Sequence, residues 1–512
     1  MGRNFTWCLL LAVSAVACGE ESGGGAGGAG SGATSSGGAP SGGSSGGGGV
    51  SGTAGAGSGG AAGAGAAGAG GVAGNAGAPS GGGTAGAGGV GAGGTGGTAG
   101  GGGTQLTWTR HTLAQLAGAA WTVVAELDGD SKPEVIGVGF GAQAGLAVPV
   151  GEVNVYTRTA GLGTWAPAPM VPATANLNFP NSPTLSDVDG DGDLDAVVPT
   201  GFLVCTAIPG GGPCGGLFWY ERAGASWLPH TVVAKGAALF YHHAEHVDFD
   251  GDGVKDLVTV AEAAGAFGGP GQAQAQWFKG TTTADRFETT ARKIGDGGGS
   301  VPTVTDLDGD GDLDVVSAQY FVKDASFVWF ERTAEPSAGA PAGTFVKHAI
   351  DTQSGPSILF QLVPNLYGDG VLRAIGANHT NTSKAPPDTA AEGVFVFDVP
   401  AGGALAQPWP RTPISFGMKS RAGSPFAPQG APGVFDVGDV DGDGDLDVAV
   451  SGDGDPRVFW LEQSPSGWFT HVVADSLGQA GGLRIADLDG SGTAELVVPV
   501  YEANAIYVFE HP

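Results

Sequence analysis

The chain has 512 residues, of which 100 are glycine, and it carries a formal net charge of −29. Its 21 Lys and Arg residues are spread thinly, which excludes the basic face that nucleic-acid phosphates require, so we predict no nucleic-acid partner.

The first 18 residues have the build of a secretory signal. An apolar run from Trp7 to Ala17 follows Arg3 and is too short to span a bilayer as a helix. The sequence AVAC at 15–18 resembles the bacterial lipoprotein box, which implies cleavage before Cys18 and lipidation of that cysteine. An ordinary signal peptide cut near Ala17 or beyond is the alternative. Both predict export to the bacterial cell envelope, where the protein is lipid-anchored or secreted and meets the membrane only through that anchor.

Residues 19–104 consist almost entirely of Gly, Ala, Ser and Thr and contain no aromatic residue. Such a segment cannot bury enough apolar surface to offset its conformational entropy, so we predict a disordered linker. With about 85 flexible residues its reach is on the order of 50 Å.

From residue 105 to residue 512, one acidic phrase recurs. It reads DVDGDGDLD at 187–195 and DLDGDGDLD at 306–314, and its copies are spaced by roughly sixty residues, which indicates a repeat architecture. The seven copies begin at Glu126, Asp187, Asp248, Asp306, Asn365, Asp439 and Asp487.

Each copy is followed by three runs of residues that are typical of β-strands, except that the last copy lacks the third run. In the fourth unit these are the β-branched run VVSAQ at 315–319, the aromatic run FVWFE at 327–331 and the outer run TFVKHAI at 344–350. The seventh outer run is missing at the C-terminus and appears instead as TWTRHTL at 107–113. A ring closed by the N-terminal strand explains this placement. We therefore predict an all-β, seven-bladed β-propeller over 105–512, with an open stack of β units as the alternative.

The acidic loops have the composition of a cation site. Intact copies place carboxylates at positions 1, 3, 5 and 9 and glycine at positions 4 and 6, where the chain must turn sharply. Ca²⁺ takes roughly six to eight oxygen ligands, so we predict up to six Ca²⁺ sites, with metal-free acidic turns as the alternative. The fifth loop carries Tyr367 and Arg373 at positions 3 and 9 and is predicted to bind no ion.

The candidate ligands, in chain order, are Glu126, Asp128, Asp130 and Glu134; Asp187, Asp189, Asp191 and Asp195; Asp248, Asp250, Asp252 and Asp256; Asp306, Asp308, Asp310 and Asp314; Asp439, Asp441, Asp443 and Asp447; and Asp487, Asp489, Ser491 and Glu495.

These blades resemble the FG-GAP and VCBS-type repeats of integrin α heads and of many bacterial surface proteins, and the DxDGDGxxD loop is the specific part of the resemblance. It implies a seven-bladed propeller with calcium in the loop between the first two strands of a blade. No regular Phe-Gly precedes each loop, so the chain looks closer to the bacterial VCBS branch than to integrins.

Cys205 and Cys214 flank a Gly-Pro loop in an exported chain, which predicts a disulfide. On such a propeller, partners are expected on the face opposite the ions, where the loops at 201–216, 262–275, 379–393 and 415–433 are long.

The histidines are weaker candidates. In YHHAEH at 241–246, strand alternation puts His242 and His246 on one face and His243 and Glu245 on the other, so they do not converge on a metal. Outer-strand histidines recur in several units, at His111, His230, His348 and His471, which indicates blade packing.

Two functions from different classes remain. The first is a surface-tethered, calcium-stabilised, monomeric binding module for an unknown protein or glycan, with no catalytic residue. The alternative is a propeller-type carbohydrate-active enzyme, a polysaccharide lyase or sugar dehydratase, with its site over the central channel near His243 and Glu245.

Overall fold

The computed structural model describes residues 103–142, 147–202, 205, 206, 208, 211–265, 271–382, 388–422 and 429–512. The predicted signal peptide with its Cys18 and the predicted linker up to residue 102 lie outside the described residues. Within the described part of the chain, no helix combines the length and the apolar character needed to cross a membrane.

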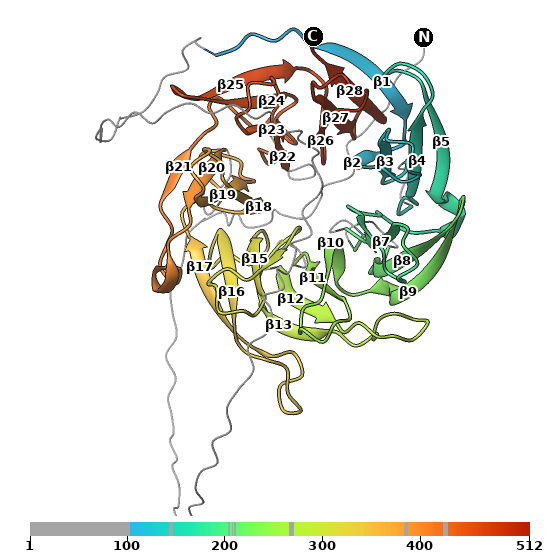
Figure 1. The fold of residues 1–512 in the computed structure, drawn as a ribbon, viewed down its shortest axis with the longest axis vertical. Helices are drawn as coiled ribbons and strands as arrows, with labels where there is room; N and C mark the ends of the chain where they lie inside the picture. Colours follow the sequence, from blue (N-terminus) through green and yellow to red (C-terminus); the bar gives the residue numbers. More distant parts are fainter. Residues whose placement is uncertain are drawn as a thin grey trace, which may run out of the picture. The chain divides into compact units, whose positions relative to one another are not determined.

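Seven four-stranded antiparallel sheets stand around a central axis in chain order, as predicted (Figure 1). We number the blades by their acidic loops. Blades 1 to 3, from inner to outer strand, are β2 (Ala119–Ala125), β3 (Glu134–Gly139), β4 (Glu152–Arg158) and β5 (Trp165–Val171); β6 (Thr184–Ser186), β7 (Asp195–Thr200), β8 (Gly215–Ala223) and β9 (Ser226–Ala237); and β10 (Phe240–Val247), β11 (Asp256–Ala263), β12 (Gln272–Phe278) and β13 (Arg292–Asp296).

Blades 4 to 6 are β14 (Thr303–Thr305), β15 (Asp314–Ala318), β16 (Phe327–Ala334) and β17 (Thr344–Asp351); β18 (Ser357–Pro364), β19 (Leu372–Asn378), β20 (Val394–Asp398) and β21 (Arg411–Pro413); and β22 (Phe435–Gly438), β23 (Asp447–Ser451), β24 (Val458–Ser464) and β25 (Gly467–Ala474). Blade 7 consists of β26 (Arg484–Ala486), β27 (Glu495–Val500), β28 (Ala505–Glu510) and β1 (Thr109–Gln115). Among the described residues, two short 3-10 turns, at Ala173–Ala175 and Gly402–Ala404, lie outside the sheets.

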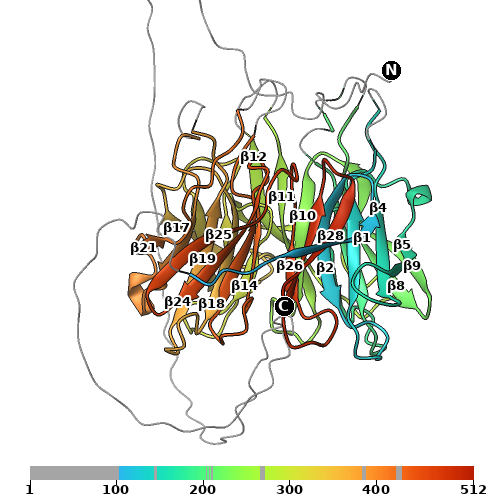
Figure 2. The ribbon, with the colours of Figure 1, turned by 90° about the horizontal axis from the view of Figure 1, so that it is seen from above.

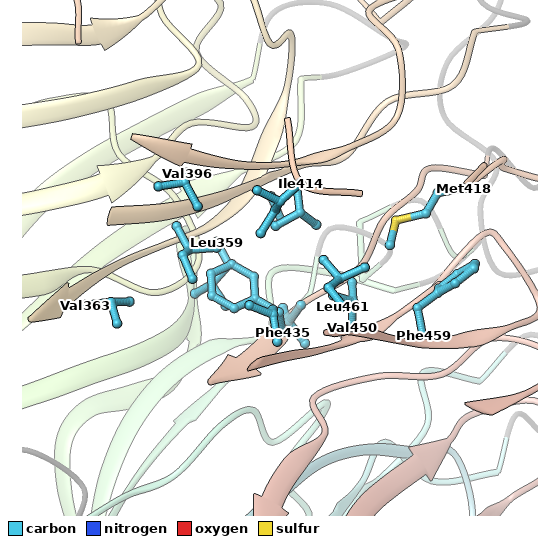
Figure 3. Close-up of a cluster of buried hydrophobic side chains, with 14 of the residues drawn as sticks. Leu359, Val363, Val396, Ile414, Met418, Phe435, Val450, Phe459 and Leu461 are labelled. Atoms are coloured by element: carbon cyan, nitrogen blue, oxygen red, sulfur yellow. The ribbon is translucent and has the colours of Figure 1, made fainter. Parts of the chain in front are cut away.

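The core lies between neighbouring blades. Five of the second strands, β3, β7, β15, β23 and β27, are buried at every position because a sheet packs on both of their faces. Third strands contribute large aromatic side chains, and Trp219, Trp277 and Trp460 are almost completely buried. Figure 3 shows one such layer, a single cluster that includes Val396 and Ile414 of blade 5 and Leu461 of blade 6. The side chains of the β-branched and aromatic runs thus fill the space between neighbouring sheets.

The ring is closed by the N-terminal strand. β1 pairs antiparallel with β28, in a register that places Arg110 opposite Phe509 and His111 opposite Val508 (Figure 1). The sheet order β1-β28-β27-β26 therefore combines the two ends of the described chain in one blade. This confirms the predicted closure and excludes an open stack of β units.

Blade topology assigns the loops to two faces of the ring, which Figure 2 shows edge-on. Every acidic loop joins the first and second strands of its blade, so all seven lie on one face. The long segments predicted for partner binding join second to third strands, or one blade to the next, and their described parts lie on the opposite face. Parts of them, including 266–270, 383–387 and 423–428, fall outside the described residues.

Candidate metal centres

The acidic loops share one backbone conformation, which blade 4 illustrates. Asp306 accepts hydrogen bonds from the backbone N–H groups of Gly309 (2.8 Å) and Gly311 (3.2 Å). Both glycines have left-handed backbones, with φ of 81° and 101°. Asp308 and Asp310 each accept from the N–H two residues further along, at 3.1 and 3.0 Å. The Asp-Gly pattern therefore curls the chain so that alternate carboxylates stay on the inside of the turn.

The carboxylate at position 9 anchors the loop to the sheet. Asp314 is 1% exposed and accepts hydrogen bonds from the backbone N–H of Leu307 (3.2 Å) and of Arg332 (2.8 Å), the latter on the third strand. Burial raises the pKa of Asp314 to about 7, against the hydrogen bonds that lower it, and burial also raises the pKa of Asp447 in blade 6 to about 7. A buried carboxylate of this kind needs a proton or a nearby cation.

The carboxylates converge in at least five of the loops. In each, three side chains offer oxygens that all lie within 4.8 Å of one another. These sets are Glu126, Asp128 and Glu134; Asp187, Asp189 and Asp195; Asp248, Asp250 and Asp256; Asp306, Asp308 and Asp310; and Asp439, Asp441 and Asp447. Since Ca²⁺ holds its oxygens at roughly 2.3–2.6 Å, ligands on opposite sides of one ion lie about 5 Å apart, and the donor sets fit that requirement.

Blade 5 differs in the way the sequence suggested. The Arg373 guanidinium binds Asp369 with two hydrogen bonds of 2.8 Å and approaches Asp398 at 3.3 Å. It also lies over the ring of Tyr367, 4.4 Å from the ring centre. The positive charge at position 9 therefore neutralises the acidic residue of its own loop. That this blade binds no ion stays a prediction.

Blade 3 contains a cation that sequence reasoning missed. The ammonium of Lys279 lies 2.7 Å from Asp250, 2.7 Å from Asp252 and 3.8 Å from Asp256. Burial lowers the pKa of Lys279, but hydrogen bonds to Asp250 and Asp252 outweigh it, so the net pKa is raised and the amine stays charged. The loop geometry thus holds a positive charge among positions 3, 5 and 9. Aligning the blades by their third strands would have pointed to this residue.

The outer-strand histidines have partners within their own blades. His348 stacks on Trp329 at 4.7 Å between ring centres and bonds Glu331 at 2.6 Å. The pairs His230–Glu221, His471–Glu462 and His111–Glu510 repeat the contact at 3.0, 2.6 and 2.7 Å. These contacts explain the recurrence of histidine in the outer strands.

The YHHAEH stretch does not gather into one site. The register of β10 shifts between Tyr241 and Ala244, so the strict alternation assumed from the sequence is interrupted there. His243 contacts Glu245 at 3.3 Å, whereas His246 bonds Ser186 at 2.9 Å. His243 and His246 thus have separate partners.

His242 has a partner that sequence reasoning did not identify. Its Nε2 lies 3.5 Å from Glu262 Oε2, at the opposite end of the blade from the acidic loop. Glu262 is 1% exposed, and its Oε1 has no hydrogen-bond partner among the described residues. Burial raises the pKa of Glu262 to about 8. No sequence motif marks this glutamate, which meets His242 only through the pairing of β10 with β11.

Cys205 and Cys214 form a disulfide within the β7–β8 loop, where Cys214 directly precedes β8. Parts of that loop lie outside the described residues.

Residues 215–317 and 439–498 match the FG-GAP-like repeat family. None of the curated proteins matches the chain. Among solved structures, an α-L-arabinofuranosidase from Fusarium graminearum with an iminosugar inhibitor is 10% identical, with a TM-score of 0.40 over 77% of this chain and 93% of that one. A GH93 α-L-arabinofuranosidase of Fusarium graminearum with arabinobiose is 9% identical (TM-score 0.40, 79% and 98% covered), and a Dos1 propeller is 11% identical (0.41, 79% and 95%). Similarity at this level carries no information about ligands or chemistry.

Proposed function

We propose that this chain, a seven-bladed propeller with FG-GAP-like repeats, is a calcium-stabilised binding module that presents one face of its ring to a protein or glycan partner. Calcium ions held by the acidic loops stiffen the other face. In this proposal the N-terminal signal and linker place the monomeric propeller outside a bacterial cell.

The observation that supports this proposal most directly is the burial of the carboxylate at position 9. In blades 2, 4 and 6 these residues, Asp195, Asp314 and Asp447, are at most 1% exposed. Among the described residues, no Lys or Arg forms an ion pair with the loop carboxylates of these blades, unlike those of blades 1, 3 and 5. A divalent cation among positions 1, 3, 5 and 9 would compensate this charge, as the lysine does in blade 3.

Calcium would act on these loops as a structural clamp. It would neutralise carboxylates that otherwise repel one another and would tie the first–second strand connection to the third strand through position 9. Because the unfolded chain does not assemble these donors, binding stabilises the fold.

The test is thermal unfolding of the full chain in excess calcium, in excess magnesium and in chelator. We expect calcium to raise the Tm by many degrees, since each site at a hundredfold excess over its Kd contributes about 2.7 kcal/mol. Magnesium should have a smaller effect, because it tolerates such crowded carboxylate sets poorly.

Matched variants assign the effect to the loops. Asp308→Asn removes a position-3 ligand in blade 4 and should lower the calcium-dependent part of the Tm shift. Asp398→Asn is the control, because it removes an aspartate from blade 5, whose loop is not intact. It should leave the calcium-dependent Tm shift unchanged. An identical Tm with calcium and chelator, with no metal retained by elemental analysis, would refute the proposal.

A carbohydrate-active enzyme is the second candidate. It is supported by the inner strand β10, where His243 contacts Glu245 at 3.3 Å and Thr184 of the neighbouring blade at 3.4 Å. A screen of acidic polysaccharides for new reducing ends or unsaturated products, with His243→Ala as the comparison, decides this candidate. Activity that His243→Ala abolishes would replace the binding function with the enzymatic one.

A further inference from the structure

Blade 3 differs from blades 2, 4, 6 and 7 at the residue that directly follows the aromatic part of the third strand. This residue is Glu221 in blade 2, Glu331 in blade 4, Glu462 in blade 6 and Glu510 in blade 7. In each of those blades it bonds a histidine of the outer strand. In blade 3 the residue is Lys279, so the charge at this place is reversed.

The outer-strand partner has changed as well. Arg292 is paired with Trp277 in the register that places His230 opposite Trp219 and His348 opposite Trp329. A lysine and an arginine cannot form the contact that glutamate and histidine form. Arg292 lies instead over the Trp277 ring at 4.6 Å and bonds Glu288 at 2.9 Å.

Lys279 consequently points toward the acidic loop. Its side chain is only 14% exposed, and its ammonium lies 2.7 Å from both Asp250 and Asp252. These are positions 3 and 5 of the loop, the oxygens on which a metal ion there would depend.

We propose that Lys279 is the permanent cation of the blade 3 loop, so that this blade keeps its loop closed without a metal ion. The inference rests on the proposed function, because it leaves calcium to the loops of blades 1, 2, 4, 6 and 7. An ammonium and a metal ion cannot use the same carboxylate oxygens at once, and the lysine is tethered beside them at a high effective concentration.

The first experiment counts calcium ions bound to the full chain by equilibrium dialysis and elemental analysis. Asp250→Asn in blade 3 should leave the count unchanged, whereas the matched Asp308→Asn in blade 4 should lower it by one. Lys279→Glu, which restores the residue of the sister blades, should raise the count by one. A loss of one ion in Asp250→Asn would overturn the proposal, since calcium would then displace the lysine.

The converse variant introduces the two blade 3 residues into blade 4. Glu331→Lys combined with His348→Arg gives blade 4 the residues of blade 3, and it should lose one bound ion while hydrogen exchange shows the other blades still protected. An unchanged count in a folded double variant would also contradict the proposal.

A readout without metal separates this inference from the proposed function. In excess chelator, Lys279→Met should lower the Tm by several degrees, because Asp250, Asp252 and Asp256 lose their compensating charge, and calcium should recover part of the loss. If the unaltered chain binds no calcium, the proposed function fails on its own, and the Tm of Lys279→Met still decides the role of the lysine. An unchanged Tm in that variant would overturn it.

Discussion

At the scale of single residues, Asn181 fixes the protonation of a buried pair. Its amide nitrogen donates to the backbone carbonyls of Phe179 (3.1 Å), Gly201 (2.8 Å) and Tyr241 (3.1 Å), so its oxygen must face Nδ1 of His242, at 3.1 Å. His242 therefore carries its proton on Nδ1, and its Nε2 presents a lone pair to Glu262. Burial lowers the pKa of His242 to about 4 and raises that of Glu262 to about 8. At pH 7 the pair is neutral, with the proton on the glutamate.

This pair predicts a decline of stability at alkaline pH. Glu262 binds its proton in the fold up to about pH 8 but releases it near 4.5 when unfolded, so its stabilising contribution is complete below 4.5 and is lost as the pH rises through 8. His242, with a lowered pKa, contributes in the opposite sense and loses its contribution as the pH falls from 6.5 through 4. Between pH 6.5 and 8 the glutamate therefore dominates the pair. Burial raises the pKa of the nearby Tyr320 above its ordinary range, so that residue stays neutral over this interval.

Urea unfolding at saturating calcium and several pH values tests this assignment. The free energy of unfolding should fall by about 2 kcal/mol between pH 6.5 and pH 8, and Glu262→Gln should remove that decline. Glu245→Gln, on the neighbouring inner strand, is the matched control and should keep it. An unchanged pH profile in Glu262→Gln would mean that the glutamate is ionised in the fold.

At the scale of the loop, the turn depends on the left-handed backbone of the glycine at position 4. Gly309 has φ of 81°, and a Cβ built on it would meet no atom within 4 Å. Gly309→Ala should therefore cost about 1 kcal/mol, from the left-handed backbone alone. Gly339→Ala is the control, because Gly339 also has open space around it but no positive φ, and it should be neutral. Calorimetry of both variants in chelator measures this strain without metal binding. An equal loss of stability in Gly309→Ala and Gly339→Ala would contradict the prediction.

The acidic loop and the blade could be predicted from the sequence because their signals are local. Position 9 directly precedes a β-branched run in every copy, so the ligand pattern and the strand order could be derived together. Lys279 could not be found in this way, since it reaches the blade 3 loop only when the third strand pairs beside it. Glu262 was missed for a related reason: it meets His242 only through the pairing of β10 with β11, and the shifted register of β10 breaks the alternation that placed His242.

At the scale of the whole molecule, the ring makes distant parts of the chain depend on one another. Leu113 of β1 and Leu116 pack with Ile506 and Val508 of β28 and with Val135 of blade 1. The closing strand therefore supplies the outer edge of blade 7 and also fills the seam to blade 1. Without it, β28 would become an exposed edge strand with unpaired backbone groups.

Leu113→Ala should consequently weaken both blade 7 and the seam between blade 7 and blade 1. Leu113 is 6% exposed, so the truncation should lower the free energy of unfolding by about 2–4 kcal/mol and increase hydrogen exchange along both β1 and β28. Leu228→Ala, on the outer strand of blade 2, is the control, because Leu228 is 46% exposed and should change stability by less than about 0.5 kcal/mol. If faster exchange in Leu113→Ala stayed confined to β1, blade 7 would be stable without its N-terminal strand. Faster exchange in β28 and in the acidic loop at Asp487 would instead mean that the closing strand and the cation sites stabilise the same ring.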